Sequence, residues 1–397
     1  MDMKQYLEPS QYKMYQNFSD FVCENIEPHA NSWEIEQGIP SDVIKTCATN
    51  GYLGGTLPAE YGGLEWDYVT YGLFTEAIAR GSVSLSGLFN VHTMVTETIL
   101  KWGTENQKNQ WLPLLASGNQ IAALALTEPG AGSDLNMIKT NFDQHGDKLI
   151  LNGVKKWNTF GAAADVFLVF GKLNGEQPIA CLVPKDSVGV NVTHIRDMLG
   201  FKAAYLAEIE FNNVEIPLEN IIGRPGFAFT YLAPYALEFG RISIAFAALG
   251  VLRTCLEICG NHVLHRSAFG NSLIDHGMIS HMVTDMGVDL EASILLSLEA
   301  CKAKNEHRAD ATEKIMIAKY FASRSGTRHS TNAVQIMGAL GCNDNYSISR
   351  CFRDSKTMEI VEGSNQIHQL LLGKGFAKKA KRAIEKIPVT KGVIQPG

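Results

Sequence analysis

The sequence lacks the short motifs that most directly identify a cofactor or a metal. Its eight cysteines show no Cys-x-x-Cys spacing, so neither a zinc ribbon nor a dithiol redox centre is indicated. A chain of this length needs no disulfide framework, so we expect reduced, mostly buried thiols and no metal site. No Gly-x-Gly-x-x-Gly occurs, because Gly130 and Gly132 are followed by Leu135 where a third glycine would stand. A Rossmann nucleotide site is therefore not predicted.

The sequence also has no excess of positive charge and no long apolar run. The formal net charge is −6 and the isoelectric point is near 6.0, which disfavours a primary role on nucleic acid. No stretch reaches the uninterrupted apolar length of a membrane span, and the amino terminus lacks a basic region followed by an apolar core. We therefore expect a cytoplasmic protein with neither a membrane nor a nucleic acid as its partner.

Length and composition are those of a well-cored protein with two or three domains. The chain has 397 residues, of which 45% are hydrophobic and 19% are charged. Helical spacing of apolar residues dominates the first part, short runs rich in Val, Ile and Phe follow, and helical spacing then returns. We predict an α+β protein with a helical domain at 1–119, a β-barrel or sandwich domain at 120–230, and a helical bundle at 231–397, with a ligand pocket at their junction.

Local signals mark individual elements within this plan. Ser41 and Asp42 are a plausible helix start, and Gly51 a plausible stop. The expected strands lie at 148–151, 166–170, 179–183 and 208–211. Apolar stripes with helical spacing run through 246–263 and 283–298, and we interpret them as core faces.

A first stretch with functional side chains lies near the start of the β domain. It reads Leu-Thr-Glu-Pro-Gly-Ala-Gly-Ser-Asp over 126–134 and is followed by Lys-Lys-Trp-Asn-Thr over 155–159. Thr127, Ser133 and Thr159 supply hydroxyls, the glycines allow close approach to the backbone, and Trp157 offers a flat aromatic face. Each residue alone is more often part of a turn or a core, but the combination suits an isoalloxazine ring.

A second such stretch lies near the other end of the sequence. It places a carboxylate, Glu362, beside Gly363, where a substrate could approach the backbone. Most glutamates are solvated surface groups, yet Met358, Ile360 and Val361 flank this one and indicate partial burial. Because burial raises the pKa of a carboxyl, Glu362 is our candidate for a catalytic base.

Together, these stretches resemble the acyl-CoA dehydrogenase family. Further matching motifs are Arg-Ser-Ala-Phe-Gly at 266–270, Gln-Ile-Met-Gly at 335–338 and Glu-Gly-Ser-Asn-Gln at 362–366. The resemblance covers nearly the whole chain in the same α–β–α order, and it implies a carboxyl-terminal four-helix bundle. It also implies FAD as cofactor, an acyl thioester of CoA or of an acyl carrier protein as substrate, and an electron-transfer flavoprotein or other acceptor as partner. A homodimer or homotetramer is expected.

The resemblance assigns roles to individual residues. Glu362 would remove the proton alpha to the thioester carbonyl while hydride leaves the beta carbon for flavin N5. The cofactor-binding positions would be Leu126, Thr127, Gly132, Ser133, Trp157, Thr159, Arg266, Phe269, His276, Gln335, Gly338, Ser364 and Gln366. Four of these would reach the FAD of a neighbouring subunit, namely Arg266, Phe269, His276 and Gln335. Substrate-binding positions would be Ser133, Glu238, Arg241 and Gly363.

Simpler interpretations of three of these residues stay open. Arg266 could form an ordinary surface salt bridge, and His276 could be a satisfied polar residue at a helix start. Arg241 could pair with Glu238 at i, i+3 along one helix, a contact worth about 0.2–0.5 kcal/mol.

Departures from the usual fatty-acid-degrading pattern leave the substrate open. Val361 precedes the base where an aromatic residue is usual, Ala339 replaces a second glycine, and Gly277 replaces a glutamine. A long straight acyl chain is therefore not a safe expectation. The chain also resembles hydroxymalonyl carrier-protein dehydrogenases of polyketide pathways, in which the hydride would leave a hydroxyl-bearing carbon.

Two further alternatives concern the fate of the electrons and the class of protein. An acyl-CoA oxidase would let oxygen reach the reduced flavin. A DNA-binding alkylation-response flavoprotein would carry an added basic carboxyl-terminal region, which we do not expect here because the sequence ends soon after Lys391.

Overall fold

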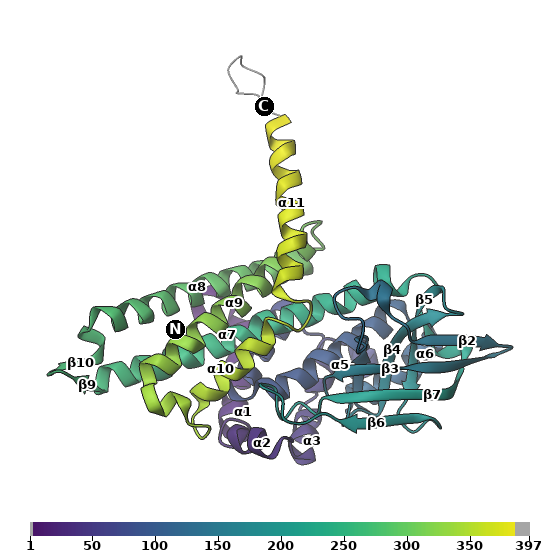
Figure 1. Cartoon of the computed structure of the whole chain (residues 1–397), viewed down its shortest axis with the longest axis horizontal. Coiled ribbons are helices and arrows are strands. Elements are labelled where there is room, and N and C mark those ends of the chain that lie inside the picture. The colour runs from purple at the N-terminus through teal and green to yellow at the C-terminus, as the bar shows by residue number, and fades with distance from the viewer. Residues whose placement is uncertain (1–2, 386–397) are drawn as a thin grey trace.

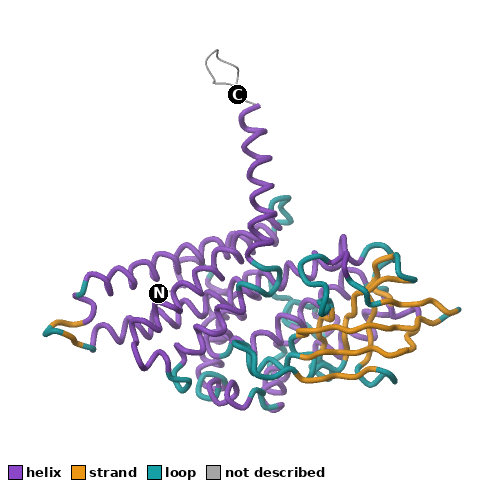
Figure 2. The backbone as a smooth tube through the Cα atoms, viewed as in Figure 1, coloured by secondary structure: helices purple, strands orange, loops and turns teal. Residues whose placement is uncertain are grey.

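The computed structural model describes residues 3–385 and confirms the α–β–α order (Figure 1). Helices form most of the first and last parts of the chain. The strands of the main sheet gather at one end of the molecule, and a short two-stranded hairpin lies at the other (Figure 2). The amino-terminal helices are α1 (Pro9–Asn25), α2 (Ala30–Glu36), α3 (Ser41–Thr49), α4 (Tyr68–Gly81), α5 (Val83–Trp102) and α6 (Glu105–Ala116). The helix predicted to start at Ser41 does so.

Helices α4 and α5 form the buried centre of the amino-terminal part. Asp67 caps α4 by accepting a hydrogen bond from the backbone N–H of Thr70 at 2.7 Å. Ser82 caps α5 in the same way by accepting from the N–H of Leu85 at 3.1 Å. Such caps give an acceptor to backbone N–H groups that have none within the helix. Both helices are buried along almost their whole length and pack against the long helix α7 of the carboxyl-terminal part.

The middle of the chain forms an eight-stranded mixed sheet. Its strands are β1 (Ala122–Ala125), β2 (Asn141–His145), β3 (Lys148–Asn158), β4 (Val166–Leu173), β5 (Gln177–Pro184), β6 (Val190–His194), β7 (Ala207–Pro217) and β8 (Ile221–Ile222). The order is β6-β7-β3-β2-β4-β5-β8, and β1 pairs in parallel with β4. The four predicted strand segments lie inside β3, β4, β5 and β7.

The carboxyl-terminal part is the predicted helical bundle. Its helices are α7 (Ala233–His265), α8 (Gly277–Asn305), α9 (Ala311–Met337), α10 (Ser347–Met358) and α11 (Asn365–Glu385). Helices α7 to α10 pack together, with α7 and α9 at the centre. A short hairpin of β9 (Ser267–Ala268) and β10 (Asn271–Ser272) joins α7 to α8, and α11 touches α9 before it projects from the body (Figure 1).

The apolar character of α7 follows from its central position. The helical stretch Ala228–His265 is long and apolar enough to cross a membrane by length and composition alone, but 83% of its most apolar window is buried inside the protein. Its surface is therefore covered by α4, α5, α8 and α9. The eight cysteines are all free thiols and six of them are buried, which confirms that most of the thiols are buried.

Candidate active site

Glu362 lies on a tight turn between α10 and α11. Its backbone has φ +58°, and Gly363 follows with φ +87°. A left-handed backbone is uncommon for glutamate, and such strain persists only where surrounding contacts hold it. Arg241 on α7 supplies one of these contacts, because its Nε donates to the Glu362 carbonyl oxygen at 3.2 Å.

The Glu362 carboxyl points into the space between α5 and α7. Asn90 on α5 donates from Nδ2 to Oε1 of Glu362 at 3.1 Å. A Cβ added at Gly240 on α7 would lie 2.9 Å from Oε1 and closer still to the other carboxyl atoms. Only glycine therefore leaves room for this carboxyl at position 240.

Burial and nearby charges act in opposite directions on this carboxyl. Burial raises the pKa of Glu362 above its usual range, while the hydrogen bond from Asn90 and the charges of Arg241 and Lys319 lower it in part. The sequence predicted this partial burial, and the net upward shift suits a group that must accept a proton.

Glu238 and Arg241 do not form the intrahelical pair that was one interpretation of their spacing. Glu238 instead forms an ion pair with Lys304 of α8 and accepts a hydrogen bond from Thr312 of α9. The Lys304 ammonium also lies 5.0 Å from the centre of the Tyr235 ring. Arg241 instead binds the Glu362 carbonyl oxygen in the turn.

The segment 126–134 is tied to β3 by a buried ion pair. Lys155 Nζ lies 2.8 Å from Glu128 Oε1 and donates to the Leu126 carbonyl at 2.9 Å. Glu128 also accepts from the backbone N–H groups of Lys139 and Thr140, at 2.7 and 2.9 Å. Burial lowers the pKa of Lys155 to about 8 despite the attraction of Glu128. The pair fixes the path of the predicted cofactor segment.

Beside this pair lie three hydroxyl groups and the ring of Trp157, whose centre is 5.2 Å from the Lys156 ammonium. Trp157 is 48% exposed and has φ +64°. Within residues 3–385, the hydroxyls of Thr127, Ser133 and Thr159 make no hydrogen bond, and a Cβ added at Gly132 would meet nothing within 4 Å. An aromatic face beside free hydroxyls and open backbone fits the edge and face of an isoalloxazine.

Helix α5 brings the two distant stretches together. A Cβ added at Gly87 would lie 3.0 Å from Thr159 Cγ2, so this part of α5 touches the end of β3. Asn90, three residues further along and therefore on the same helix face, bonds to Glu362. The hydroxyl-rich segment and the carboxylate thus converge on one face of one helix.

Comparison with protein-family models decides the identity of this arrangement. The N-terminal, middle and C-terminal domain models of acyl-CoA dehydrogenase match residues 8–119, 123–214 and 230–377. The chain belongs to the acyl-CoA dehydrogenase family. An acyl-CoA dehydrogenase of Bacillus subtilis (strain 168) is 34% identical over 369 residues, which are 92% of this chain and 97% of that protein. The mitochondrial short-chain specific acyl-CoA dehydrogenase of Homo sapiens is 33% identical over 90% of this chain and 88% of its own.

Solved structures agree with this assignment and with the cofactor. Butyryl-CoA dehydrogenase from Megasphaera elsdenii has a TM-score of 0.89 at 28% identity and covers 94% of this chain and 99% of its own. A glutaryl-CoA dehydrogenase from Mycobacterium smegmatis, solved in complex with FADH2, has a TM-score of 0.90 at 27% identity and covers 96% and 97%. This member of the acyl-CoA dehydrogenase family is therefore an FAD-dependent oxidoreductase.

Two other similar structures are described by a polyketide extender unit or by an acyl carrier protein. FkbI, described for biosynthesis of the methoxymalonyl extender unit of a polyketide, has a TM-score of 0.83 at 27% identity and covers 92% of this chain and 99% of its own. The prolyl acyl carrier protein oxidase AnaB has a TM-score of 0.87 at 26% identity and covers 93% and 99%.

The residues predicted to contact a neighbouring subunit's FAD lie away from Glu362 in this chain. Phe269 sits in the β9–β10 hairpin and is 97% exposed, at the end of the bundle opposite the sheet (Figure 1). His276 bonds to the Ala268 carbonyl at 3.1 Å, as expected of a satisfied residue at a helix start. Arg266 makes no ion pair within the described residues, and Gln335 is exposed near the end of α9.

The remaining predicted positions surround the ends of two helices. Gly338 ends α9 with φ +60°. Ser364 precedes α11, and its Oγ accepts from the N–H of Ile367 at 3.4 Å, while Gln366 is exposed on the first turn. These cofactor and substrate roles stay predictions.

Sequence reasoning missed the residues that shape the site from outside the motifs. Asn90 is a polar residue within the apolar stretch of α5, and this was the only signal that could have singled it out. Gly240 lies between the predicted positions Glu238 and Arg241, but its role depends on a carboxyl brought from 122 positions further along the chain. Lys319 gave no signal beyond its place in a helical pattern.

Proposed function

We propose that this protein dehydrogenates a short acyl thioester and that Glu362 is the catalytic base. The observation that supports this most is the convergence of Glu362 and the segment ending at Thr159 on one face of α5. FAD, when bound, supplies the hydride acceptor. The proton on the alpha carbon passes to the Glu362 carboxylate and a hydride leaves the beta carbon, so the product is the α,β-unsaturated thioester.

The turn at Glu362 also offers the donor that such a reaction requires. An alpha proton is too weakly acidic for a carboxylate unless the developing negative charge on the thioester oxygen is stabilised. Within residues 3–385, the backbone N–H of Glu362 donates to no acceptor, so it is free to bind that oxygen. The base and the donor then belong to one residue, and the contact of Arg241 with its carbonyl orients both.

A 2-hydroxyacyl group on a carrier protein is a second candidate substrate. The similarity to AnaB, a prolyl acyl carrier protein oxidase, and to FkbI, described for biosynthesis of a polyketide extender unit, favours this candidate. Val361 is also smaller than the aromatic residue expected before the base. In that reaction Glu362 would take the proton of the hydroxyl group, and the hydride would leave the carbon that bears this hydroxyl. Anaerobic titration of the FAD-loaded protein with acyl-CoAs, acyl carrier proteins and 2-hydroxyacyl carrier proteins distinguishes these candidates. We expect bleaching of the flavin band by one class, and its absence with every thioester would contradict the proposal.

The electron acceptor and the assembly are proposed from the family. An electron-transfer flavoprotein would reoxidise the flavin, whereas rapid peroxide formation in air would indicate an oxidase. We propose a homodimer or homotetramer in which the exposed Phe269 hairpin meets a partner copy. A monomer that retains FAD during analytical ultracentrifugation would contradict this assembly.

The substitution Gly240→Ala should disable the base without unfolding the protein. Its methyl group would overlap the Glu362 carboxyl and push it from its position between α5 and α7. A displacement of about 1 Å can cost about 10²-fold in rate. We expect a loss of this size in single-turnover flavin reduction, with FAD still bound. Gly260→Ala, also on α7, is the matched control, because a Cβ there meets nothing within 4 Å.

The substitution Asn90→Ala should shift the pH dependence of the reaction. Asn90 donates to the ionised carboxyl and lowers the pKa of Glu362, so its removal raises that pKa. Because only the ionised carboxylate accepts a proton, the acid limb of flavin reduction should move to higher pH. Thr98→Ala on the same helix, whose hydroxyl bonds to Met94 O, should leave the limb in place. A limb that stays unchanged in Asn90→Ala would exclude this hydrogen bond from the reacting state.

A further inference from the structure

A buried lysine on the central bundle helix holds both sides of the Glu362 turn. Lys319 of α9 has an exposed fraction of 0%. Its Nζ lies 2.9 Å from the Gly363 carbonyl oxygen, 3.2 Å from Asn365 Oδ1 and 3.5 Å from the Glu359 carbonyl oxygen. An ammonium has three donors and no acceptor, so the three oxygens match its full capacity. Glu359 precedes Glu362 in the sequence, and Gly363 and Asn365 follow it. The Lys319 Nζ atom therefore binds oxygens on both sides of the turn.

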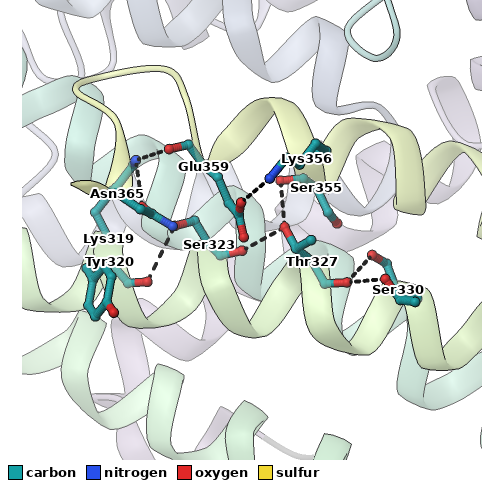
Figure 3. Close-up of polar contacts among 10 residues, drawn as sticks. Lys319, Tyr320, Ser323, Thr327, Ser330, Ser355, Lys356, Glu359 and Asn365 are labelled. Atoms are coloured by element: carbon teal, nitrogen blue, oxygen red, sulfur yellow. Dashed lines mark hydrogen bonds and ion pairs between the residues drawn. The ribbon is translucent and has the colours of Figure 1, made fainter. Parts of the chain in front are cut away.

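A second side chain of α9 completes this attachment. Ser323, one helical turn after Lys319, donates from Oγ to Asn365 Oδ1 at 3.0 Å. The amide oxygen of Asn365 thus accepts from two neighbouring side chains of α9 (Figure 3). The backbone N–H of Asn365 also donates to the Glu359 carbonyl at 2.9 Å. The turn is therefore closed on itself and anchored to the bundle.

A lysine is a costly choice for a purely structural contact at this place. Burial lowers the pKa of Lys319 to about 7, against the attraction of Glu362 and Glu359. A buried ammonium is retained only where oxygens satisfy it and a negative charge lies near. The groups that face the Glu362 carboxyl and Lys319 are Arg241 of α7, Glu359 of the turn, His368 of α11 and Tyr71 of α4.

We propose that Lys319 is a positioning residue for Glu362, acting by holding the carbonyls of Glu359 and Gly363 and by placing a positive charge near the carboxylate. This inference rests on the proposed function of Glu362 as base. Lys319 itself touches neither the carboxyl nor the space where a substrate would lie, and it acts through the turn. Its loss would remove a donor from both carbonyls, of which that of Glu359 would keep the N–H of Asn365. It would also remove a charge that favours the ionised carboxylate.

The test compares Lys319→Met with Lys314→Met on the FAD-loaded protein. Lys314 lies on the same helix but is partly exposed, and its nearest acidic oxygen, Glu299 Oε1, is 3.8 Å away. We expect Lys319→Met to reduce kcat for thioester oxidation about 10- to 100-fold, with a smaller change in KM. The acid limb of the pH profile should also move to higher pH, because loss of a nearby positive charge raises the pKa of a carboxyl. Lys314→Met should resemble the wild-type protein in kcat, KM and acid limb.

A second variant distinguishes the effect of the hydrogen bonds to the turn from the effect of the Lys319 charge. It also provides a test if Lys319→Met does not fold. Asn365→Ala removes the amide oxygen shared by Lys319 and Ser323 but keeps the ammonium, so kcat should fall without movement of the acid limb. Thermal melting shows whether each variant is folded. A folded Lys319→Met with wild-type kcat and acid limb would overturn the inference. If Lys319→Met does not fold, a wild-type kcat in both Asn365→Ala and Ser323→Ala would overturn it.

The outcome for Glu362 itself is measured separately. If Glu362→Gln still reduces its flavin with a thioester, the proposed function fails whatever Lys319 does. If Glu362→Gln is inactive and Lys319→Met is indistinguishable from wild type, only the positioning role fails.

Discussion

Glu362→Gln should retain FAD but lose flavin reduction by any thioester that reduces the wild-type protein. Glutamine keeps the shape of the side chain and the bond to Asn90 but cannot accept a proton. A positioned general base contributes about 10²–10⁴-fold in rate. We expect a loss at the upper end of this range, because no other carboxylate of the described residues lies between Asn90 and Gly240. Anaerobic stopped-flow absorbance of the flavin measures this directly.

A neighbouring glutamate provides the control for this substitution. Glu359 lies on the same turn, but its side chain pairs with Lys356. Glu359→Gln should therefore reduce the flavin at a rate within a few-fold of the wild-type rate. Equal losses in both variants would indicate a general disturbance of the turn rather than removal of a base.

Glu128→Gln should give the largest loss of stability among single substitutions at the site. Lys155 is fully buried, and Glu128 is its only charged partner within the described residues. Glutamine has a single acceptor oxygen, so it could keep the hydrogen bond from Lys139 or the one from Thr140 but not both, and the ammonium would be left without a countercharge. Removing one partner of a buried ion pair costs about 3–5 kcal/mol. Urea denaturation should show a decrease of this size in the free energy of unfolding.

An exposed ion pair and a double variant make this stability test specific. Lys148 and Glu215 are 56% and 63% exposed, so Lys148→Met should change the free energy of unfolding by less than about 1 kcal/mol. Adding Lys155→Met to Glu128→Gln should recover part of the loss, because the unpaired charge is removed. A decrease below about 1 kcal/mol for Glu128→Gln alone would contradict the assigned role of the pair.

The order of the domains could be predicted because it depends on local periodicity. The apolar spacing over 246–263 anticipated α7, and Ser41 marked the start of α3. The parallel pairing of β1 with β4 could not be predicted in this way. The pairing joins two strands that have two other strands between them in the sequence. No turn sequence connects β1 directly to β4, so no local pattern indicates that they pair.

The carboxyl proposed as the base could be singled out from the sequence, but the environment that shifts its pKa could not. Glu362 was singled out from its apolar neighbours and its motif, and its partial burial and raised pKa agree with that reasoning. Asn90, Gly240 and Lys319 act on it from α5, α7 and α9. Contacts between side chains so far apart in sequence arise from packing, and a single sequence does not encode them locally.

Hydrogen exchange at the alpha carbon tests the central role of Glu362 most directly. The wild-type and Glu362→Gln proteins would be incubated in D2O with a thioester that has alpha but no beta hydrogens, which can lose a proton but no hydride. Mass spectrometry of the recovered thioester measures deuterium uptake. We predict uptake with the wild-type protein and only the uncatalysed background with Glu362→Gln. Equal uptake with both proteins would show that another group removes the proton.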